Sequence, residues 1–184
     1  MGRAKVKTSE EMERIYRRFA HQFVEPFDNA TQLAVVGMQT RGVHVGRRIC
    51  QIIKEELGTD VNFGILDVTF YRDDFRTKGN IPEVKVTEIP FELEGRDVIL
   101  VDDVLFTGRT IRSAMDALMA YGRPQSIKFC CMVDRGHREL PVNADYVGVF
   151  LPTHHKEEVR VKVKELDEED AIYLVNTETG EAEE

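Results

Sequence analysis

The residues best suited to chemistry lie in one short segment near the middle of the chain. Four apolar residues, 98–101, lead directly into Asp102 and Asp103, and Thr-Gly-Arg-Thr follows at 107–110. Gly108 lets the backbone approach an anion, and hydroxyls beside the free N–H groups of a helix start can hold a phosphate. The carboxylates would repel that phosphate, but they suit vicinal hydroxyls or a hydrated metal ion. The segment therefore predicts a site for a ribose and its 5′-phosphate.

Other interpretations of this segment are weaker. The chain contains neither the Gly-x-x-x-x-Gly-Lys-Ser/Thr pattern of nucleotide triphosphatases nor the Gly-x-Gly-x-x-Gly pattern of dinucleotide-binding proteins. The two aspartates could form only a polar turn and a helix cap, and Thr-Gly-x-Thr alone is common. The complete arrangement over 98–110 is much rarer, which favours the ribose-phosphate interpretation.

The elements around this segment predict how it is positioned. Apolar runs typical of buried strands lie at 33–37, 61–71, 97–101, 127–133 and 146–150. Helical patterns follow Thr8 as a cap, with Met12, Ile15, Phe19 and Phe23 on one face, and recur at 43–57, ending at Gly58, and at 110–121, ending at Gly122. Strands that alternate with helices indicate an α/β fold with a mostly parallel sheet flanked by helices.

Three loops should meet at one edge of this sheet. Ligands of such sheets bind at the carboxyl ends of the strands. The segments 38–42, 102–110 and 134–137 each follow a predicted strand directly. We therefore expect these three loops to converge on a single site.

Composition limits the class of protein. The chain has 184 residues, 42% hydrophobic and 32% charged, so we expect one globular domain over 1–184. Its net charge of −8 argues against nucleic-acid binding driven by overall charge, although a local basic patch is compatible with it. No apolar leader or membrane-spanning stretch is evident, so we expect a soluble, cytoplasmic protein. Cys130 and Cys131 lie in an apolar run and are expected to be buried structural thiols.

Several segments together resemble a known family. They are Val36–Gly42, Phe70–Asp74, Val98–Thr110, Gly122–Pro124, Val133–Pro141 and Ala144–Gly148. Residues 98–110 resemble the phosphoribosyl pyrophosphate (PRPP) motif of type I phosphoribosyltransferases. The chain as a whole, over roughly 8–175, more closely resembles the family of pyrimidine-operon attenuators and uracil phosphoribosyltransferases. Asp-Arg-Gly-His-Arg-Glu-Leu-Pro, at 134–141, is the most specific part of the resemblance.

The resemblance implies a role for each part of the central segment. Asp102 and Asp103 would bind the ribose hydroxyls, partly through Mg²⁺, and with Arg41 they would be the catalytic residues. The 5′-phosphate would be held by Thr107, Gly108, Arg109 and Thr110, and the remaining substrate-binding positions of the loop would be Val104, Leu105 and Phe106.

A second loop is expected to bind pyrophosphate. Thr40, Arg41 and Gly42 resemble the pyrophosphate loop of the family. The residues agree with this, because Arg41 is a cation at a strand end beside a glycine that frees backbone N–H groups. A plain surface charge is the alternative for Arg41.

The resemblance also implies the parts that enclose the substrate. A mobile flap is expected over about 72–85, where Arg72 could steady the pyrophosphate, and a small C-terminal hood over about 150–176. Asp73 and Asp74 suit solvated loop charges and functional groups equally well. Residues 177–184 are expected to be a frayed acidic tail.

The base is expected to be a pyrimidine. Purine phosphoribosyltransferases often carry an acid at the position of Phe106, whereas an aromatic residue, usually tyrosine, is common in the resembled family. Arg135 is the best candidate for contacting uracil and Val159 a weaker one, although Asp134 beside Arg135 could only cap a turn. The expected reaction converts uracil and PRPP to UMP and pyrophosphate.

Many members of the resembled family also bind the leader RNA of pyrimidine operons when UMP is bound. The residues that could serve this second role are Arg17, His21 and Arg138. Asn143 and Val149 stand where RNA-binding relatives often carry a cation, which favours a salvage enzyme with weakened RNA control. The alternatives are a bifunctional regulator, a PRPP or UMP sensor with little turnover, and a purine transferase. The family also implies a homo-oligomer, a dimer or larger.

Overall fold

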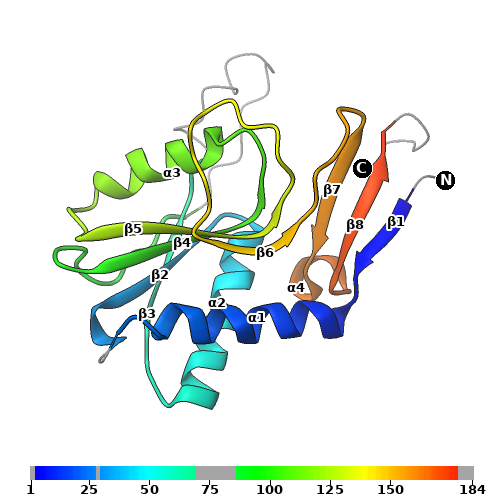
Figure 1. Ribbon diagram of the computed structural model, residues 1–184. Helices are drawn as coiled ribbons and strands as arrows, with labels where there is room; N and C mark the ends of the chain where they lie inside the picture. The colour runs from blue at the N-terminus through cyan, green and yellow to red at the C-terminus, as the bar shows by residue number, and fades with distance from the viewer. Residues whose placement is uncertain (1–2, 28–29, 69–85, 178–184) are drawn as a thin grey trace.

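The computed structural model describes residues 3–27, 30–68 and 86–177 (Figure 1). The elements are β1 (Arg3–Lys7), α1 (Ser9–Val24), a 3₁₀ turn (Ala30–Gln32), β2 (Leu33–Met38), α2 (Arg41–Leu57), β3 (Asn62–Leu66), β4 (Asp97–Leu105), α3 (Arg109–Met119), β5 (Ser126–Asp134), β6 (Tyr146–Phe150), β7 (Glu157–Lys162), α4 (Lys164–Asp167) and β8 (Ala171–Asn176). The predicted flap, with Arg72, Asp73 and Asp74, lies outside the described residues, as does the acidic tail from residue 178 onward.

The larger sheet has five strands in the order β3-β2-β4-β5-β6, and each pair of neighbours is parallel. Its strands bury alternate residues on two faces. Leu33 and Val35 pack with α1 and α2, whereas Ala34 and Val36 pack with α3. Figure 1 shows the same two layers of helices on either side of the sheet. The predicted α/β fold is therefore confirmed.

The first helix begins as its sequence predicts. The Thr8 hydroxyl accepts a hydrogen bond from the backbone N–H of Glu11, and the Glu11 carboxylate accepts one from the Thr8 N–H, so both ends of a capping box are present. Arg18, on the exposed side of α1, donates to the carbonyls of Val147 and Gly148 at 2.9 and 2.8 Å. The helix thereby covers part of the outer edge of β6.

A second, antiparallel sheet has the order β1-β8-β7, and we call it, together with α4, the hood. The C-terminal part was predicted, but the participation of the chain's N-terminus was not. Residues 3–7 are too polar to be recognised as a strand, yet they pair with β8, where Arg3 lies opposite Val175. The Arg3 guanidinium also stacks on the ring of Tyr173, 3.5 Å from its centroid. The hood therefore joins both ends of the chain (Figure 1).

Two strand predictions had the wrong boundaries. The strand predicted to run to residue 71 ends at Leu66. The strand predicted to end at Val101 continues to Leu105, because its backbone stays paired with β5 as far as the Leu105–Asp134 match. Asp102 and Asp103 therefore stand on a strand rather than in a free loop, which fixes their backbone.

The helix predicted at 110–121 begins at Arg109 and ends at Met119. Gly122 was predicted to cap it and does not, since the helix is already closed by Ala120 in a right-handed conformation. Gly58 does end α2 in the left-handed conformation, as predicted. Cys130 and Cys131 are both fully buried, as expected for structural thiols.

Candidate functional site

The three predicted loops do converge, because β2, β4 and β5 are neighbours whose carboxyl ends lie at one edge of the sheet. Two pockets lie at this edge. The first, which we call the loop pocket, has a volume of about 310 Å³ and is lined by Asp102, residues 104–111, Phe129 and Glu139. It therefore contains most of the predicted PRPP motif.

The loop pocket ends at the start of α3, where the first backbone N–H groups have no partner within the helix. Gly108 caps the helix with φ +91°, a left-handed conformation that favours glycine, and a Cβ there would meet the Leu140 Cβ at 3.4 Å. The Thr107 hydroxyl accepts a hydrogen bond from the Arg109 N–H at 3.3 Å. A helix N-terminus that opens into a pocket beside hydroxyl groups suits a phosphate.

The family-specific segment 134–141 supports this loop from behind. The N–H groups of Glu139 and Leu140 both donate to the Thr107 carbonyl, at 3.0 and 3.2 Å. Arg138 donates to the Phe106 carbonyl at 2.9 Å, and the Glu139 carboxylate pairs with the Arg109 side chain at 2.7 Å. The Arg109 guanidinium is thus already engaged. This supporting role of Arg138 and Glu139 was not visible in the sequence.

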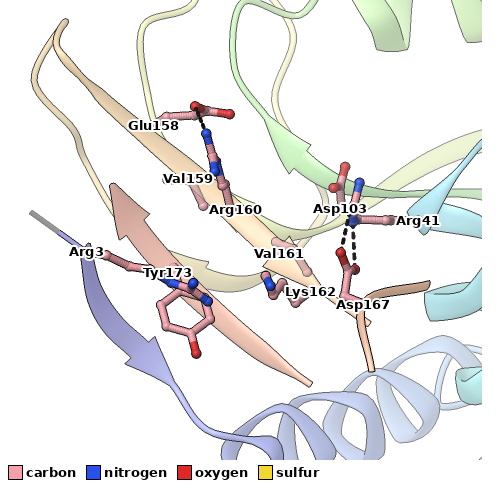
Figure 2. Close-up of a pocket in the computed structure, with 10 residues that line it drawn as sticks. All are labelled: Arg3, Arg41, Asp103, Glu158, Val159, Arg160, Val161, Lys162, Asp167 and Tyr173. Carbon is pink, nitrogen blue, oxygen red and sulfur yellow. Dashed lines mark hydrogen bonds and ion pairs between the residues drawn. The ribbon is translucent and has the colours of Figure 1, made fainter. Parts of the chain in front are cut away.

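The second pocket, which we call the hood pocket, lies between the hood and the end of β4 and has a volume of about 490 Å³ (Figure 2). It is lined by Arg3, Arg41, Asp103, residues 158–162, Asp167 and Tyr173. Arg41 is the first residue of α2 and follows Thr40, whose peptide bond with Gln39 is cis. Its guanidinium donates to the Asp167 carboxylate at 2.9 and 3.3 Å. Asp167 was not predicted as a site residue.

Adjacent residues of β4 thus line different pockets, Asp102 the loop pocket and Asp103 the hood pocket. Burial raises the pKa of Asp103, and a hydrogen bond with Asp102 and the charge of Arg41 offset this only in part. The pKa of Arg41 is raised, chiefly by its hydrogen bond to Asp167. The end of β4 therefore separates the two pockets and contributes one carboxylate to each of them.

Gly42 brings the predicted pyrophosphate loop close to the end of β4. A Cβ at Gly42 would lie 2.3 Å from the carbonyl oxygen of Val101 and 3.0 Å from the Cα of Asp102. Only glycine lets the start of α2 pack so closely on β4. This contact places Arg41 beside Asp103, in accordance with the predicted grouping of the two loops.

The predicted base-contacting residues are partly brought together. The Arg135 guanidinium lies over the ring of Phe106, 4.1 Å from its centroid, and donates to the Thr153 hydroxyl and the Glu157 carbonyl. Burial lowers the pKa of Arg135. Val159 lies instead on β7 and lines the hood pocket.

His137 was overlooked in the sequence. Its ring meets that of Phe106 edge-on at 6.0 Å, and its Nε2 lies 2.6 Å from the Thr153 carbonyl oxygen. Phe106, Arg135 and His137 therefore form an aromatic and cationic group beside the loop pocket.

The three residues predicted for RNA lie in different surroundings. Arg17 and His21 are exposed on α1, where Arg17 pairs with Glu56 and Glu13. Arg138 pairs with Asp134 and donates to three backbone carbonyls beside the loop pocket. Its contacts with Phe106 and Asp134 place it beside the carboxyl ends of β4 and β5, whereas Arg17 and His21 lie on α1. The structure does not gather the three into one patch.

Among the residues that the structure describes, no group of three or more His, Cys, Asp or Glu side chains could hold a metal ion. No helix in the same part of the chain is long and apolar enough to cross a bilayer.

Residues 2–168 match the phosphoribosyl transferase domain family. Among solved structures, hypoxanthine phosphoribosyltransferase from Staphylococcus aureus has a TM-score of 0.72 over 97% of this chain and 94% of that chain, at 20% identity. The Trypanosoma cruzi enzyme has a TM-score of 0.70 over 95% of this chain and 90% of that one, at 17% identity. At such identities these two likenesses concern the fold alone.

Curated relatives are much closer in sequence. The bifunctional protein PyrR of Elusimicrobium minutum is 49% identical over 170 residues, which are 92% of this chain and 95% of that protein. PyrR of Thermus thermophilus is 48% identical over 172 residues, 94% of this chain and 95% of that protein. PyrR of Deinococcus radiodurans is 46% identical over 176 residues, 96% of each chain. This chain therefore belongs to the phosphoribosyltransferase family and, within it, to the bifunctional PyrR proteins.

Proposed function

We propose that this protein transfers the ribosyl phosphate of PRPP to N1 of uracil, forming UMP and releasing pyrophosphate. One observation carries the proposal: a pocket suited to a ribose phosphate and a pocket with a fixed arginine share the end of β4 as their common wall. A substrate with a phosphate at one end and a pyrophosphate at the other matches this pair of pockets. Membership of the PyrR group supports the same activity.

The chemistry of each pocket supports one arrangement of the substrate. Its 5′-phosphate binds in the loop pocket, held by N–H groups at the start of α3 and by the hydroxyls of Thr107 and Thr110. The ribose lies across the end of β4, where Asp102 and Asp103 accept hydrogen bonds from its hydroxyls. The pyrophosphate then reaches Arg41 in the hood pocket.

Two adjacent carboxylates fit a magnesium ion that is bound mainly through its substrate. Mg²⁺ keeps several waters and usually takes one or two protein carboxylates together with substrate phosphates. Asp102 and Asp103 offer that donor set, and the described residues contain no larger cluster that would bind the ion alone. When bound, Mg²⁺ neutralises charge on the departing pyrophosphate.

The protein contributes position and electrostatics. The bond from C1′ of the ribose to the pyrophosphate oxygen breaks and its electron pair leaves with pyrophosphate. N1 of uracil forms the new bond to C1′, and its proton passes to solvent. Arg41 stabilises the charge that builds up on the leaving group. The backbone of the loop pocket holds the 5′-phosphate and thus keeps C1′ in line between uracil and pyrophosphate.

The base is held beside Phe106 and Arg135. The aromatic ring offers a stacking surface, and the guanidinium is fixed by Thr153 and Glu157. Phe106 cannot supply a carboxylate to a purine ring nitrogen, so the site favours a pyrimidine. Uracil needs less assistance from a protein carboxylate than a purine does, since the nitrogen of uracil that attacks C1′ ionises more readily.

Steady-state formation of UMP from uracil, PRPP and Mg²⁺, with guanine and hypoxanthine as rival bases, tests the proposal. We expect turnover selective for uracil that disappears in the Asp102→Asn, Asp103→Asn double variant. Turnover with a purine instead would show that the substrate is that purine and not uracil. Tight binding of PRPP without turnover of any base would indicate a nucleotide sensor and contradict the enzyme assignment.

We also propose that UMP promotes binding of pyrimidine-operon leader RNA. Arg14, Arg17 and His21 recur at spacings of three and four on the exposed side of α1, where cations can meet phosphates. Fluorescence anisotropy with a leader transcript, with and without UMP, measures this. The Arg14→Gln, Arg17→Gln variant should weaken binding, and Lys54→Gln, an exposed cation on α2, should not. Absence of UMP-dependent binding in the unchanged protein would leave a salvage enzyme.

Self-association into a dimer or larger assembly remains a prediction from the family. Sedimentation equilibrium of the protein, with and without UMP, measures it directly. A mass of one chain at micromolar concentration would contradict the prediction.

A further inference from the structure

Two arginines of α2 clamp the helix to the hood. Arg41 and Arg48 are seven residues apart, close to two helical turns, and so lie on one side of α2. Arg41 donates to Asp167 at 2.9 and 3.3 Å. Arg48 donates to Glu165 at 2.8 and 2.6 Å and to Asp170 at 2.8 Å. A hood segment of six residues thus places three acids against two arginines of α2.

Asp167 and Asp170 are closely matched within these clamps. The side chain of each has a relative exposure of 14%. Asp167 also accepts a hydrogen bond from the Val163 N–H at 3.0 Å, and Asp170 accepts one from the Lys164 N–H at 2.8 Å. Both carboxylates are therefore fixed by the hood's own backbone as well as by an arginine.

The two clamps differ in what their arginine faces. Arg41 and Asp167 line the hood pocket together with Asp103, whereas Arg48 and Asp170 do not. Figure 2 shows the Arg41 guanidinium between the carboxylates of Asp167 and Asp103, with the bonds to Asp167 on one side of it. Only the Arg41 clamp can therefore influence a ligand in the hood pocket.

The Arg41 clamp leaves part of the guanidinium for a ligand. A guanidinium has five N–H donors in a planar fork. The bonds to Asp167 use Nε and Nη2 of Arg41, so neither uses Nη1. A planar cation held along one edge presents its other edge in a fixed direction, which suits the paired oxygens of a phosphate.

We propose that Asp167 is a positioning residue for the transfer reaction. It acts through Arg41, whose guanidinium it holds in the orientation that receives the pyrophosphate group of PRPP, and it touches neither the base nor the ribose. Because Arg41 is ordered before the ligand arrives, binding costs less side-chain entropy. This inference rests on the proposed function and extends it to a residue 126 positions away from Arg41 in the chain.

The matched pair of aspartates gives the experiment its control. KM for PRPP, KM for uracil and kcat are measured for the unchanged protein, Asp167→Asn and Asp170→Asn, each in the full chain. The dissociation constant of magnesium pyrophosphate is measured for the same proteins by calorimetry. Thermal unfolding of each variant reports how far the substitution destabilises the fold.

We expect Asp167→Asn to raise KM for PRPP and the dissociation constant of magnesium pyrophosphate about tenfold. KM for uracil should stay within about twofold, because the clamp does not reach the base. Asp170→Asn should lower the unfolding temperature to a similar extent and leave both pyrophosphate measurements within about twofold. Asp167→Glu, which keeps the charge, should recover part of the affinity.

A double-mutant cycle separates an action through Arg41 from a direct one. Arg41→Gln weakens pyrophosphate binding by itself, and adding Asp167→Asn to it should change the dissociation constant little further. Independent, multiplying effects of the two substitutions would overturn the proposal. So would an unchanged or tighter pyrophosphate affinity in Asp167→Asn, or an equal loss in Asp170→Asn.

Failure of the proposed function has a different signature. If the unchanged protein makes no UMP, the uracil transferase assignment falls, but calorimetry with magnesium pyrophosphate still decides the role of Asp167. A tenfold weaker affinity in Asp167→Asn would then support the positioning role at a binding site without turnover. No measurable pyrophosphate binding by the unchanged protein would overturn it.

Discussion

The two pockets at the edge of the sheet are built in opposite ways. The loop pocket takes nine of its eleven lining residues, Asp102 and 104–111, from one stretch of chain, and it is held by backbone hydrogen bonds from Glu139 and Leu140. The hood pocket is assembled from β1, the start of α2, the end of β4 and the segment from β7 to β8. The hood is docked by ion pairs between side chains and by the apolar residues Val161, Val163 and Ile172, which pack in the core shared with α1 and α2.

Because of this difference, the loop pocket depends on the local structure of one turn, whereas the hood pocket depends on the position of the hood against α2. The loop pocket keeps its form as long as one turn and its support are intact, so a substitution there should alter chemistry more than stability. The hood pocket exists only while the hood is docked on α2, so substitutions there should alter stability and ligand binding together. Gly42 packs against the backbone of Val101 and Asp102, next to the end of β4 that both pockets share.

The largest effect on stability is expected from Gly42→Ala, which pushes the start of α2 away from β4. The new methyl group would lie 2.3 Å from the carbonyl oxygen of Val101, a backbone atom that cannot rotate away. We expect a loss of about 3 kcal/mol or more in the free energy of unfolding, measured by urea denaturation. Gly58→Ala, at φ +66° with no atom within 4 Å, should lose only about 1 kcal/mol. Equal losses in the two variants would show that α2 does not depend on this close approach.

Gly108→Ala, in the loop pocket, should lower catalytic efficiency more than it lowers the stability of the fold. The residue has φ +91°, so alanine would strain the turn by about 1–2 kcal/mol and move the N–H groups that we propose to hold the 5′-phosphate. We expect kcat/KM for PRPP to fall about 100-fold, on the order of 3 kcal/mol in transition-state binding. Gly95→Ala imposes a similar strain at φ +71°, away from both pockets, and should leave kcat/KM nearly unchanged. A parallel fall in both variants would assign the effect to folding.

The same contrast explains what the sequence could and could not predict. Asp102, Asp103 and the Thr-Gly-Arg-Thr turn are contiguous, so their spacing alone predicted the ribose-phosphate chemistry and the helix that follows. Thr40, Arg41 and Gly42 follow the neighbouring strand, and the parallel order of strands brings them to the same edge. Such features depend on local pattern and on one general rule of α/β sheets.

Features that depend on distant pairing were not predictable in this way. Nothing near Asp167 distinguishes it from the other acids at the end of the chain, and only the folded hood brings it to Arg41. Residues 3–7 become a strand because β8 offers them an edge, although their own pattern is polar. The resemblance predicts Arg138 as an RNA contact, and this stays a prediction. Its hydrogen bonds to Phe106, Gly136 and Val142 give it in addition a supporting role that the sequence did not reveal.

An intermediate effect is expected at Phe106, which lines the loop pocket and which we propose to lie beside the base. Its side chain is exposed enough, at 40%, for truncation to leave the fold intact. Phe106→Ala removes the surface on which Arg135 lies, and we expect KM for uracil to rise about tenfold while KM for PRPP changes little. Phe106→Tyr keeps the ring and should stay within about twofold of the unchanged protein. If PRPP affinity falls instead, Phe106 supports the phosphate turn rather than the base.

The smallest effect is expected from a fall in pH, which should weaken the Arg41 clamp and lower the unfolding temperature. Burial by itself would raise the pKa of Asp167, but the hydrogen bonds from Arg41 and from the Val163 N–H, with the charge of Arg41, outweigh it and lower this pKa below 3.8. A carboxyl group whose pKa is lowered by folding stabilises the protein fully above its unfolded pKa, and this stabilisation is lost as pH falls through the lowered value.

At pH 7 we therefore expect the unchanged protein to unfold roughly 2–4 °C above Asp167→Asn, a gap typical of one partly exposed ion pair. Differential scanning fluorimetry from pH 7 to pH 3 should show the gap narrowing as pH falls below the ordinary aspartate pKa of about 3.9, because the unfolded chain then takes up a proton that the folded carboxylate resists. A gap that stays constant down to pH 3 would mean that the carboxylate charge of Asp167 does not hold the hood in place.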